Sequence, residues 1–143
     1  MIAIASDHGG YALKQELLRH LEKRGVEFKD FGCYSEASCD YPAYAKAVAG
    51  AVKSGEAEKG ILICGTGIGM SIAANKVPGI RAAAVSDCFT AKATREHNDA
   101  NILCLGGRTV GPELALMIAD IFLTTPFSGA ERHARRIAQI EEN

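Results

Sequence analysis

The sequence contains no tryptophan, only 6% aromatic residues and no long apolar run. No stretch approaches the ~20 apolar residues that a membrane-spanning helix needs, and the start of the chain lacks the basic leader and apolar core of a signal peptide. Its 16 basic and 17 acidic residues give a net charge of -1, without the overall positive field of a nucleic-acid-binding protein. We therefore expect a protein that binds neither membrane nor nucleic acid.

The sequence also lacks a recognisable cysteine framework. Its five cysteines are odd in number, widely spaced and without a CxxC pair, so they predict reduced thiols and a cytoplasmic protein rather than a set of disulfides. The spacing of cysteine and histidine matches no zinc site, and we expect no metal. The cysteines are Cys33, Cys39, Cys64, Cys88 and Cys104.

What is present is a regular alternation of two kinds of segment. The 143 residues, 48% of them hydrophobic, suit a single domain spanning 1–143. Short apolar runs alternate with helical patterns, which predicts parallel strands joined by right-handed crossovers. The expected fold is α/β, with three layers (α/β/α) and a five-stranded, Rossmann-like parallel sheet. Strands are expected at 2–5, 26–31, 60–64, 81–85 and 101–105, and helices near 13–21, 42–51, 70–76, 89–96, 114–122 and 131–141.

A glycine-rich loop joins the most apolar strand to the helix that follows it. Its residues are Gly65, Thr66, Gly67, Ile68 and Gly69. Backbone N–H groups in such a loop can hold an anion; a tight turn without a ligand is the alternative. Met70 stands where the dinucleotide fingerprint needs glycine and where a cysteine phosphatase needs arginine, and the Gly-Lys-Ser/Thr end of an NTPase phosphate loop is missing. The pattern therefore indicates an anion site of another kind.

Cys64 ends the strand directly before this loop. A thiol beside several N–H donors can be stabilised as a thiolate and act as a base or nucleophile. The alternative is a buried cysteine that packs as a small hydrophobe, which is the interpretation we give to Cys104 in another strand. Cys64 differs from Cys104 in being followed directly by the glycine loop, and this favours a chemical role for Cys64.

Two polar pairs flank other strands. Asp7 and His8 follow the first strand, and His97 and Asn98 lie just before the fifth. Histidine carries protons near neutral pH and aspartate can orient or relay them. We expect these side chains to meet at the functional edge of the sheet, where ligands bind in parallel α/β folds. The alternatives are structural: a helix cap for Asp7 and a charge at a helix carboxyl end for His97.

The last helical segment is basic on one face. Arg132 and Arg136 are four residues apart and share that face, and Arg108 lies in the turn after the fifth strand. Converging arginines bind phosphate in bidentate fashion; a solvated basic face is the alternative. Ile137 and Ile140 add an apolar stripe, and because so short a helix is unstable alone, we expect it to dock on a partner subunit.

Five segments combine these motifs: Ser6–Gly10, Asp40–Pro42, Ile63–Lys76, Arg95–Asn101 and Arg132–His133. Together they resemble the type B ribose-5-phosphate isomerase family and its galactose-6-phosphate isomerase relatives, over essentially the whole chain. The resemblance implies an enzyme without metal or cofactor that interconverts aldose and ketose phosphates through a cis-enediolate. It also implies parallel strands in the order 2-1-3-5-4.

The same resemblance implies roles for the catalytic residues. Cys64 matches the base that moves a proton between C1 and C2 of the sugar, and the amides of Gly65–Gly69 would hold the enediolate oxygen. Thr66 and His97 would open the furanose ring. Asp7 would relay protons among the hydroxyls, and Asn98 would bind one of them.

Phosphate binding and assembly are implied in the same way. The phosphate would be held by five basic residues: Arg108, Arg132, Arg136, His8 and His133. Family members are dimers or larger with a shared active site, in which His97 and the arginines come from the neighbouring chain, so we expect a homodimer or a dimer of dimers. One departure is that Ala130 and Glu131 follow Gly129 where the family has a second glycine, which adds an acid beside the phosphate-binding arginines.

The resemblance thus implies isomerisation of ribose 5-phosphate and ribulose 5-phosphate in the pentose phosphate pathway. One alternative is an isomerase of a six-carbon sugar phosphate, allose 6-phosphate or galactose 6-phosphate. Because galactose 6-phosphate isomerases generally need two different subunits, activity of this chain alone would discriminate between them. The other alternative is a catalytically silent protein that binds a sugar phosphate.

Overall fold

The computed structural model describes residues 1–142 and confirms the predicted α/β architecture. Its strands form one parallel sheet in the order β2-β1-β3-β5-β4, as the resemblance implied. The central strands β1, β3 and β5 are therefore neighbours, and the loops that follow them share one edge of the sheet. The strands are β1 (Ile2–Ser6), β2 (Phe28–Asp30), β3 (Lys59–Cys64), β4 (Ala82–Ala84) and β5 (Ile102–Gly106).

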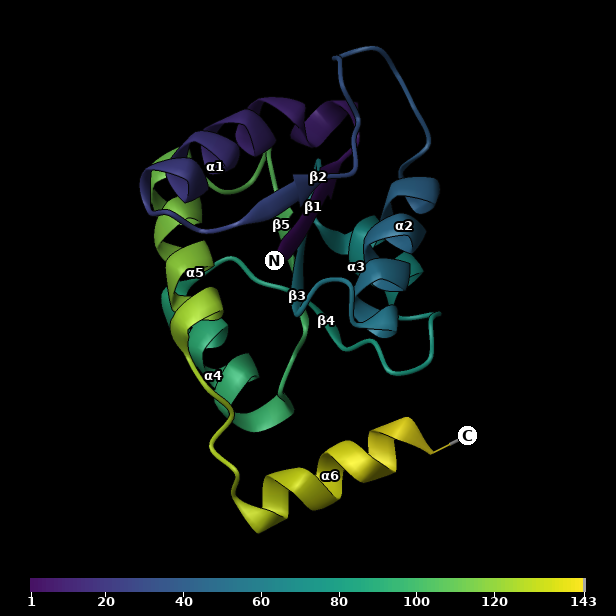
Figure 1. Cartoon of the computed structure of the whole chain (residues 1–143), viewed down its shortest axis with the longest axis vertical. Helices are drawn as coiled ribbons and strands as arrows, with labels where there is room; N and C mark the ends of the chain where they lie inside the picture. The colour runs from purple at the N-terminus through teal and green to yellow at the C-terminus, as the bar shows by residue number, and fades with distance from the viewer. Residues whose placement is uncertain (143) are drawn as a thin grey trace.

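Helices cover both faces of the sheet (Figure 1). One face carries α1 (Tyr11–Lys23), α4 (Cys88–Asn98) and α5 (Pro112–Thr124), and the other carries α2 (Tyr41–Ser54) and α3 (Ile68–Ala74). A 3-10 turn, His8–Gly10, precedes α1. The last helix, α6 (Glu131–Glu141), stands apart from these layers, at the end of the molecule where α4 ends. No helix within residues 1–142 is long and apolar enough to cross a membrane.

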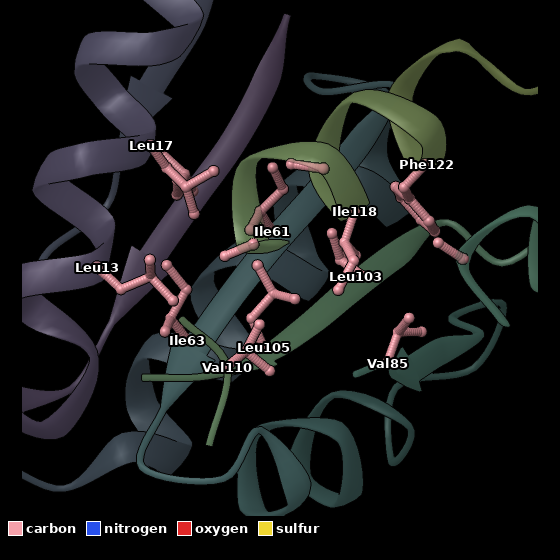
Figure 2. Packing of buried hydrophobic residues seen from close by; sticks show 14 of the residues in the cluster. Leu13, Leu17, Ile61, Ile63, Val85, Leu103, Leu105, Val110, Ile118 and Phe122 are labelled. Atoms are coloured by element: carbon pink, nitrogen blue, oxygen red, sulfur yellow. The ribbon is translucent and has the colours of Figure 1, made fainter. Parts of the chain in front are cut away.

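The two faces of the sheet bury side chains of different size. Beneath α1, α4 and α5, bulky residues such as Ile61, Leu103 and Phe122 interlock (Figure 2). Beneath α2 and α3, small residues such as Ala5 and Ala49 predominate. Each fully buried Leu, Ile or Phe stabilises the fold by ~1.5–3 kcal/mol, so the first face contributes more hydrophobic stabilisation. The small residues of the second face let α2 and α3 approach the sheet closely.

Some predicted boundaries differ from those observed. The strand predicted at 26–31 shortens to Phe28–Asp30, because this edge strand pairs only with β1. The helix predicted from Met70 begins at Ile68, because Gly67 adopts a left-handed φ of 81° and starts the helix there. The basic helix predicted at about 131–141 is confirmed.

Candidate active site

Three of the predicted site segments meet at the carboxyl edge of the sheet. Cys64 ends β3, Asp7 follows the neighbouring β1, and Arg108 follows β5 on the other side. Two backbone hydrogen bonds join the loops: the N–H of Gly107 donates to the carbonyl of Cys64 at 2.8 Å, and the N–H of Arg108 donates to that of Gly65 at 3.0 Å. One hydrogen-bonded framework therefore places the thiol, the glycine loop and Arg108.

The Cys64 thiol is 5% exposed and faces the loop that follows it. The N–H of Gly67 donates to Cys64 Sγ over 3.1 Å. The bond directs a backbone donor at the sulfur, and such a donor can stabilise negative charge that develops there. Cys104, by contrast, is enclosed in β5, where burial raises the pKa of its thiol. Of these two cysteines, Cys64 is the one with a donor directed at its sulfur.

The backbone of Gly67 makes this contact possible. Its φ of 81° lies in the left-handed region, where a side chain is strained. A Cβ at this position would also lie 3.0 Å from the carbonyl carbon of Leu105 in β5. The next donor is fixed as well, because the N–H of Ile68 bonds to Oγ1 of the exposed Thr66 at 3.2 Å. The loop is therefore held rigidly against β5 beside the sulfur.

Asp7 and Arg108 approach the same loop from the strands on either side. A Cβ on Gly9 would lie 3.3 Å from the nitrogen of Gly65, 3.4 Å from Asp7 Oδ1 and 3.5 Å from Arg108 Nη2. These three groups therefore surround one small space. Asp7 Oδ1 also accepts the N–H of Gly10 at 3.0 Å. The capping alternative for Asp7 is thus confirmed for the 3-10 turn, and the cap holds its carboxylate beside the loop.

The loop between β2 and α2 orients His8. Its Nδ1 lies 3.3 Å from the N–H of Cys39, which donates to it, so the ring carries its hydrogen on Nε2 when neutral. The start of this loop is anchored by the fully buried Lys14, which donates to Asp30 Oδ1 at 2.8 Å and to the carbonyl of Cys33. Sequence reasoning missed Lys14, although it stands at helical spacing from the buried leucines of α1.

Tyr41, the first residue of α2, lies over the glycine loop. A Cβ on Gly69 would stand 2.7 Å from the Tyr41 ring and 3.0 Å from its hydroxyl. Tyr41 lies in the Asp40–Pro42 segment on which the resemblance rests, but a tyrosine at a helix start indicates no chemical role by itself. A hydroxyl in this position can donate a hydrogen bond to a ligand held by the loop.

The other predicted site residues lie at the opposite edge of the sheet. His97 and Asn98 end α4 just before β5, which begins beside the start of β3. β3 has six residues, and at ~3.3 Å per residue it separates them from Cys64 by roughly 17 Å. The expectation that they meet Asp7 and His8 at one edge is therefore wrong within a single chain. A residue directly before a parallel strand lies at the strand's amino end.

A cluster of basic side chains forms at this amino edge. The rings of His97 and His133 stack, with centroids 4.5 Å apart and planes 21° apart. Burial, and then the charges of Arg132, His97 and Arg136, lower the pKa of His133. Burial is the largest cause of the lowered pKa, and the neighbouring cationic groups add to it. An anionic group bound here would offset their positive charge.

The acid that departs from the family pattern does not neutralise this cluster. Glu131 pairs with Arg135, whose Nη1 lies 3.1 and 2.8 Å from its two carboxylate oxygens. Within the described residues 1–142, neither Arg132 nor Arg136 has a carboxylate within 4.0 Å. Both arginines therefore remain able to bind a phosphate.

The two clusters have complementary chemistry. At the carboxyl edge, a thiol with an amide donor lies beside a carboxylate and an arginine, which suits removal of a proton from carbon and stabilisation of the resulting negative oxygen. At the amino edge, Arg132, Arg136 and the two stacked histidines gather, and none of these four is paired with a carboxylate within residues 1–142, which suits a phosphate. No three histidine, cysteine or acidic side chains among residues 1–142 come together as a metal site.

Comparison with known proteins decides the family. The sequence model of the Ribose/Galactose Isomerase family matches residues 2–140. The chain belongs to this isomerase family. The putative sugar phosphate isomerase YwlF of Bacillus subtilis is 56% identical to this chain, over 99% of this chain and 95% of its own length. Ribose-5-phosphate isomerase B of Escherichia coli is 51% identical, over 97% and 93% of the two chains.

Solved structures confirm that the chain shares its whole fold with enzymes of this family. Ribose-5-phosphate isomerase B of Clostridium thermocellum matches with a TM-score of 0.96 and 57% identity, over 98% of this chain and 94% of that one. The Mycoplasma genitalium enzyme with bound ribulose 5-phosphate matches with a TM-score of 0.92 and 45% identity, over 98% and 93%. The resemblance drawn from the sequence is therefore confirmed.

Proposed function

We propose that this protein interconverts ribose 5-phosphate and ribulose 5-phosphate, as an aldose-ketose isomerase of the pentose phosphate pathway. The observation that carries the proposal is the Cys64 thiol at the carboxyl edge, with the N–H of Gly67 3.1 Å from its sulfur. The relatives support this substrate: the 51% identical Escherichia coli protein is a ribose-5-phosphate isomerase B, and the Mycoplasma genitalium structure holds ribulose 5-phosphate.

The chemical step moves one proton between neighbouring carbons. After Thr66 and His97 open the furanose ring, the Cys64 thiolate takes the proton from C2 of the aldose. The electron pair of that C–H bond forms the C1–C2 double bond, and the π electrons of the carbonyl pass to the oxygen on C1. The amides of Gly65–Gly69 stabilise the charge on this oxygen as it develops. The thiol then returns the proton to C1 and is a thiolate again.

The hydroxyl protons must move as well. Formation of the ketose requires the oxygen on C2 to lose its proton and the oxygen on C1 to gain one. Asp7 is suited to this relay, because its carboxylate is held beside the loop by the Gly10 amide. Asn98 binds a hydroxyl further along the open chain. Neither step requires a metal or a cofactor.

The phosphate is held by groups from both edges of the sheet. Arg108 and His8 belong to the carboxyl edge, and the remaining three ligands belong to α6: Arg132, His133 and Arg136. Because roughly 17 Å of sheet separates the two edges, a complete site takes its amino-edge residues from a second copy of the chain. A homodimer, or a dimer of dimers, would supply them.

Exposed apolar side chains support this assembly. Ile68 and Ile72 are more than half exposed on α3, beside the glycine loop, and Ile140 is 61% exposed on α6. A second copy that docks α6 near the carboxyl edge would cover such residues. The five cysteines are free thiols, which suits the reducing cytoplasm that we propose as the compartment.

A six-carbon sugar phosphate, allose 6-phosphate or galactose 6-phosphate, is the second candidate substrate. The observation that favours it is the description of the family itself, which includes galactose isomerases. If a six-carbon sugar phosphate is the substrate, the pure chain should turn it over faster than ribose 5-phosphate.

The deciding experiment follows the C2 proton. The pure protein is incubated with ribose 5-phosphate in heavy water, and deuterium incorporation at C2 is measured by NMR. We expect exchange in the wild type and in Cys88→Ala, a control thiol in α4, but not in Cys64→Ala. Undiminished exchange in Cys64→Ala would rule out this base. Binding without exchange in the wild type would instead indicate the silent sugar-phosphate-binding protein.

A further inference from the structure

The helix with the proposed phosphate-binding arginines is fastened to its own chain at both ends. At the amino end, His133 stacks on His97, and in the preceding linker the N–H of Ser128 donates to the carbonyl of Glu96 at 3.3 Å. At the carboxyl end, Glu141 Oε1 accepts a hydrogen bond from Arg81 at 2.7 Å. The direction of α6, and with it the position of its arginines, therefore depends on both fastenings.

Arg81 connects α6 to the turn that ends α4. Besides its bond to Glu141, its Nε donates to the carbonyl of Asn98 at 2.9 Å and its Nη2 to that of Asp99 at 3.0 Å. The side chain is only 18% exposed. A guanidinium can bond three acceptors in different directions because its donors form a rigid, planar fork. One side chain thus joins the turn after His97 to the last turn of α6.

That turn needs support. Asp99 has a φ of 45°, in the left-handed region that a residue with a side chain adopts at a cost. Arg95 holds its carboxylate at 2.8 Å, and Arg81 holds the two carbonyls. Within residues 1–142, the last turn of α6 is hydrogen-bonded to the rest of the chain through Arg81. A cavity of about 460 Å³ lies beside the ion pair, so packing holds this end of α6 only loosely.

We propose that Arg81 is a positioning residue for the isomerase reaction. Its guanidinium fixes the turn after α4 and the end of α6 in one orientation, so that Asn98, Arg132 and Arg136 reach the substrate together. The inference rests on the proposed function. Arg81 acts through these residues and does not itself touch the substrate.

The test uses three variants of the whole chain and one control. Glu141→Ala removes the fastening of α6 and leaves the contacts of Arg81 with Asn98 and Asp99 in place. Arg81→Ala removes all three, and Arg81→Lys retains the charge without the fork. Glu56→Ala is the matched control, because it breaks the exposed Lys29–Glu56 ion pair at the edge strand β2.

Four quantities are measured: KM for ribose 5-phosphate, kcat for the same substrate, the inhibition constant of inorganic phosphate, and amide hydrogen exchange across 131–141. For Glu141→Ala we expect KM and the phosphate inhibition constant to rise roughly two- to fivefold with kcat nearly unchanged. Exchange in α6 should also be faster. Arg81→Ala should lower kcat as well, because it loosens the turn that carries Asn98, and Arg81→Lys should lie between it and the wild type. Glu56→Ala should match the wild type.

An unchanged phosphate inhibition constant and unchanged exchange in Glu141→Ala would overturn the inference, even if Arg81→Ala failed to fold. A similar rise in KM for Glu56→Ala would also overturn it, because the effect would then belong to any lost ion pair. A wild-type protein that does not turn over ribose 5-phosphate would overturn the proposed function instead, and the exchange measurement would still decide whether Arg81 fastens α6.

Discussion

Replacing Gly67 with alanine tests whether the glycine loop serves the reaction or is only a turn. Gly67 has a φ of 81°, and an added Cβ would lie 3.0 Å from the carbonyl carbon of Leu105 and 3.2 Å from that of Cys104. Gly55 provides a matched control, because its φ is 84° and nothing lies within 4 Å of an added Cβ. Comparing the two variants separates the cost of the backbone conformation from the cost of the close approach to β5.

The expected losses can be worked out from these distances. The left-handed conformation costs an alanine ~1–2 kcal/mol, which is the whole loss of stability expected for Gly55→Ala. Gly67→Ala adds overpacking against a central strand that cannot move aside, a further ~1–3 kcal/mol. Its displaced amide also weakens the bond to the Cys64 sulfur. Losing a hydrogen bond to a charged group costs ~1.5–3 kcal/mol, which lowers kcat roughly 10- to 100-fold.

Urea unfolding at one protein concentration compares the stabilities, and initial rates with ribose 5-phosphate give kcat. We expect Gly55→Ala to retain the wild-type kcat, and Gly67→Ala to lose both stability and kcat. The reasoning would be refuted if Gly67→Ala unfolded at the same urea concentration as Gly55→Ala. It would also be refuted if Gly67→Ala isomerised the sugar at the wild-type rate.

Three other perturbations test the division of the site between two edges. Cys64→Ala and His97→Ala should each be nearly inactive. When the two variants are mixed and exchange subunits, half of the dimers hold one intact site out of two, so the mixture should regain about one quarter of wild-type activity. No recovery would contradict a shared site. Arg132→Ala and Arg136→Ala should mainly raise KM, because phosphate binds alike in the ground and transition states, and an unchanged KM in both would remove α6 from the site. Because the pKa of His133 is lowered in the folded protein, its imidazole binds a proton more readily in the unfolded chain. The free energy of unfolding should therefore fall as the pH drops below ~6.5. The urea midpoint should therefore fall less from about pH 8 to about pH 5.5 in His133→Gln than in the wild type, and an equal fall in both would exclude this origin.

The fold could be predicted from the sequence because its signals are local and repeated. Apolar runs alternate with helical patterns, and this alternation is sufficient for parallel strands with helical crossovers. The order of the strands could not be predicted in this way, because local patterns do not specify which strands are neighbours. The resemblance to the family implied the order, and the observed β2-β1-β3-β5-β4 sheet confirms it.

The site was harder to predict, and His97 shows why. The residue type of His97 indicates its chemistry. The edge of the sheet at which it lies is decided instead by its position in the chain, which is before β5 and not after it. Lys14 shows another difficulty: it is in phase with Leu17 and Leu21 on the buried face of α1, but its partner Asp30 belongs to a distant strand. Helical spacing reveals that a charge is buried, and it does not reveal what neutralises it.

The separation of the two polar edges has a consequence for substrate choice. The thiol is built on the rigid carboxyl end of the sheet, and the two fastenings of α6 hold its arginines beside the amino end, so neither group can shift far to suit a longer or shorter sugar. In the proposed dimer, the span from the reacting carbons to the phosphate is fixed by the docking angle between subunits. Preference for five or six carbons is then a quaternary property, open to change through exposed residues such as Ile72 or Ile140, to which the proposed reaction assigns no role.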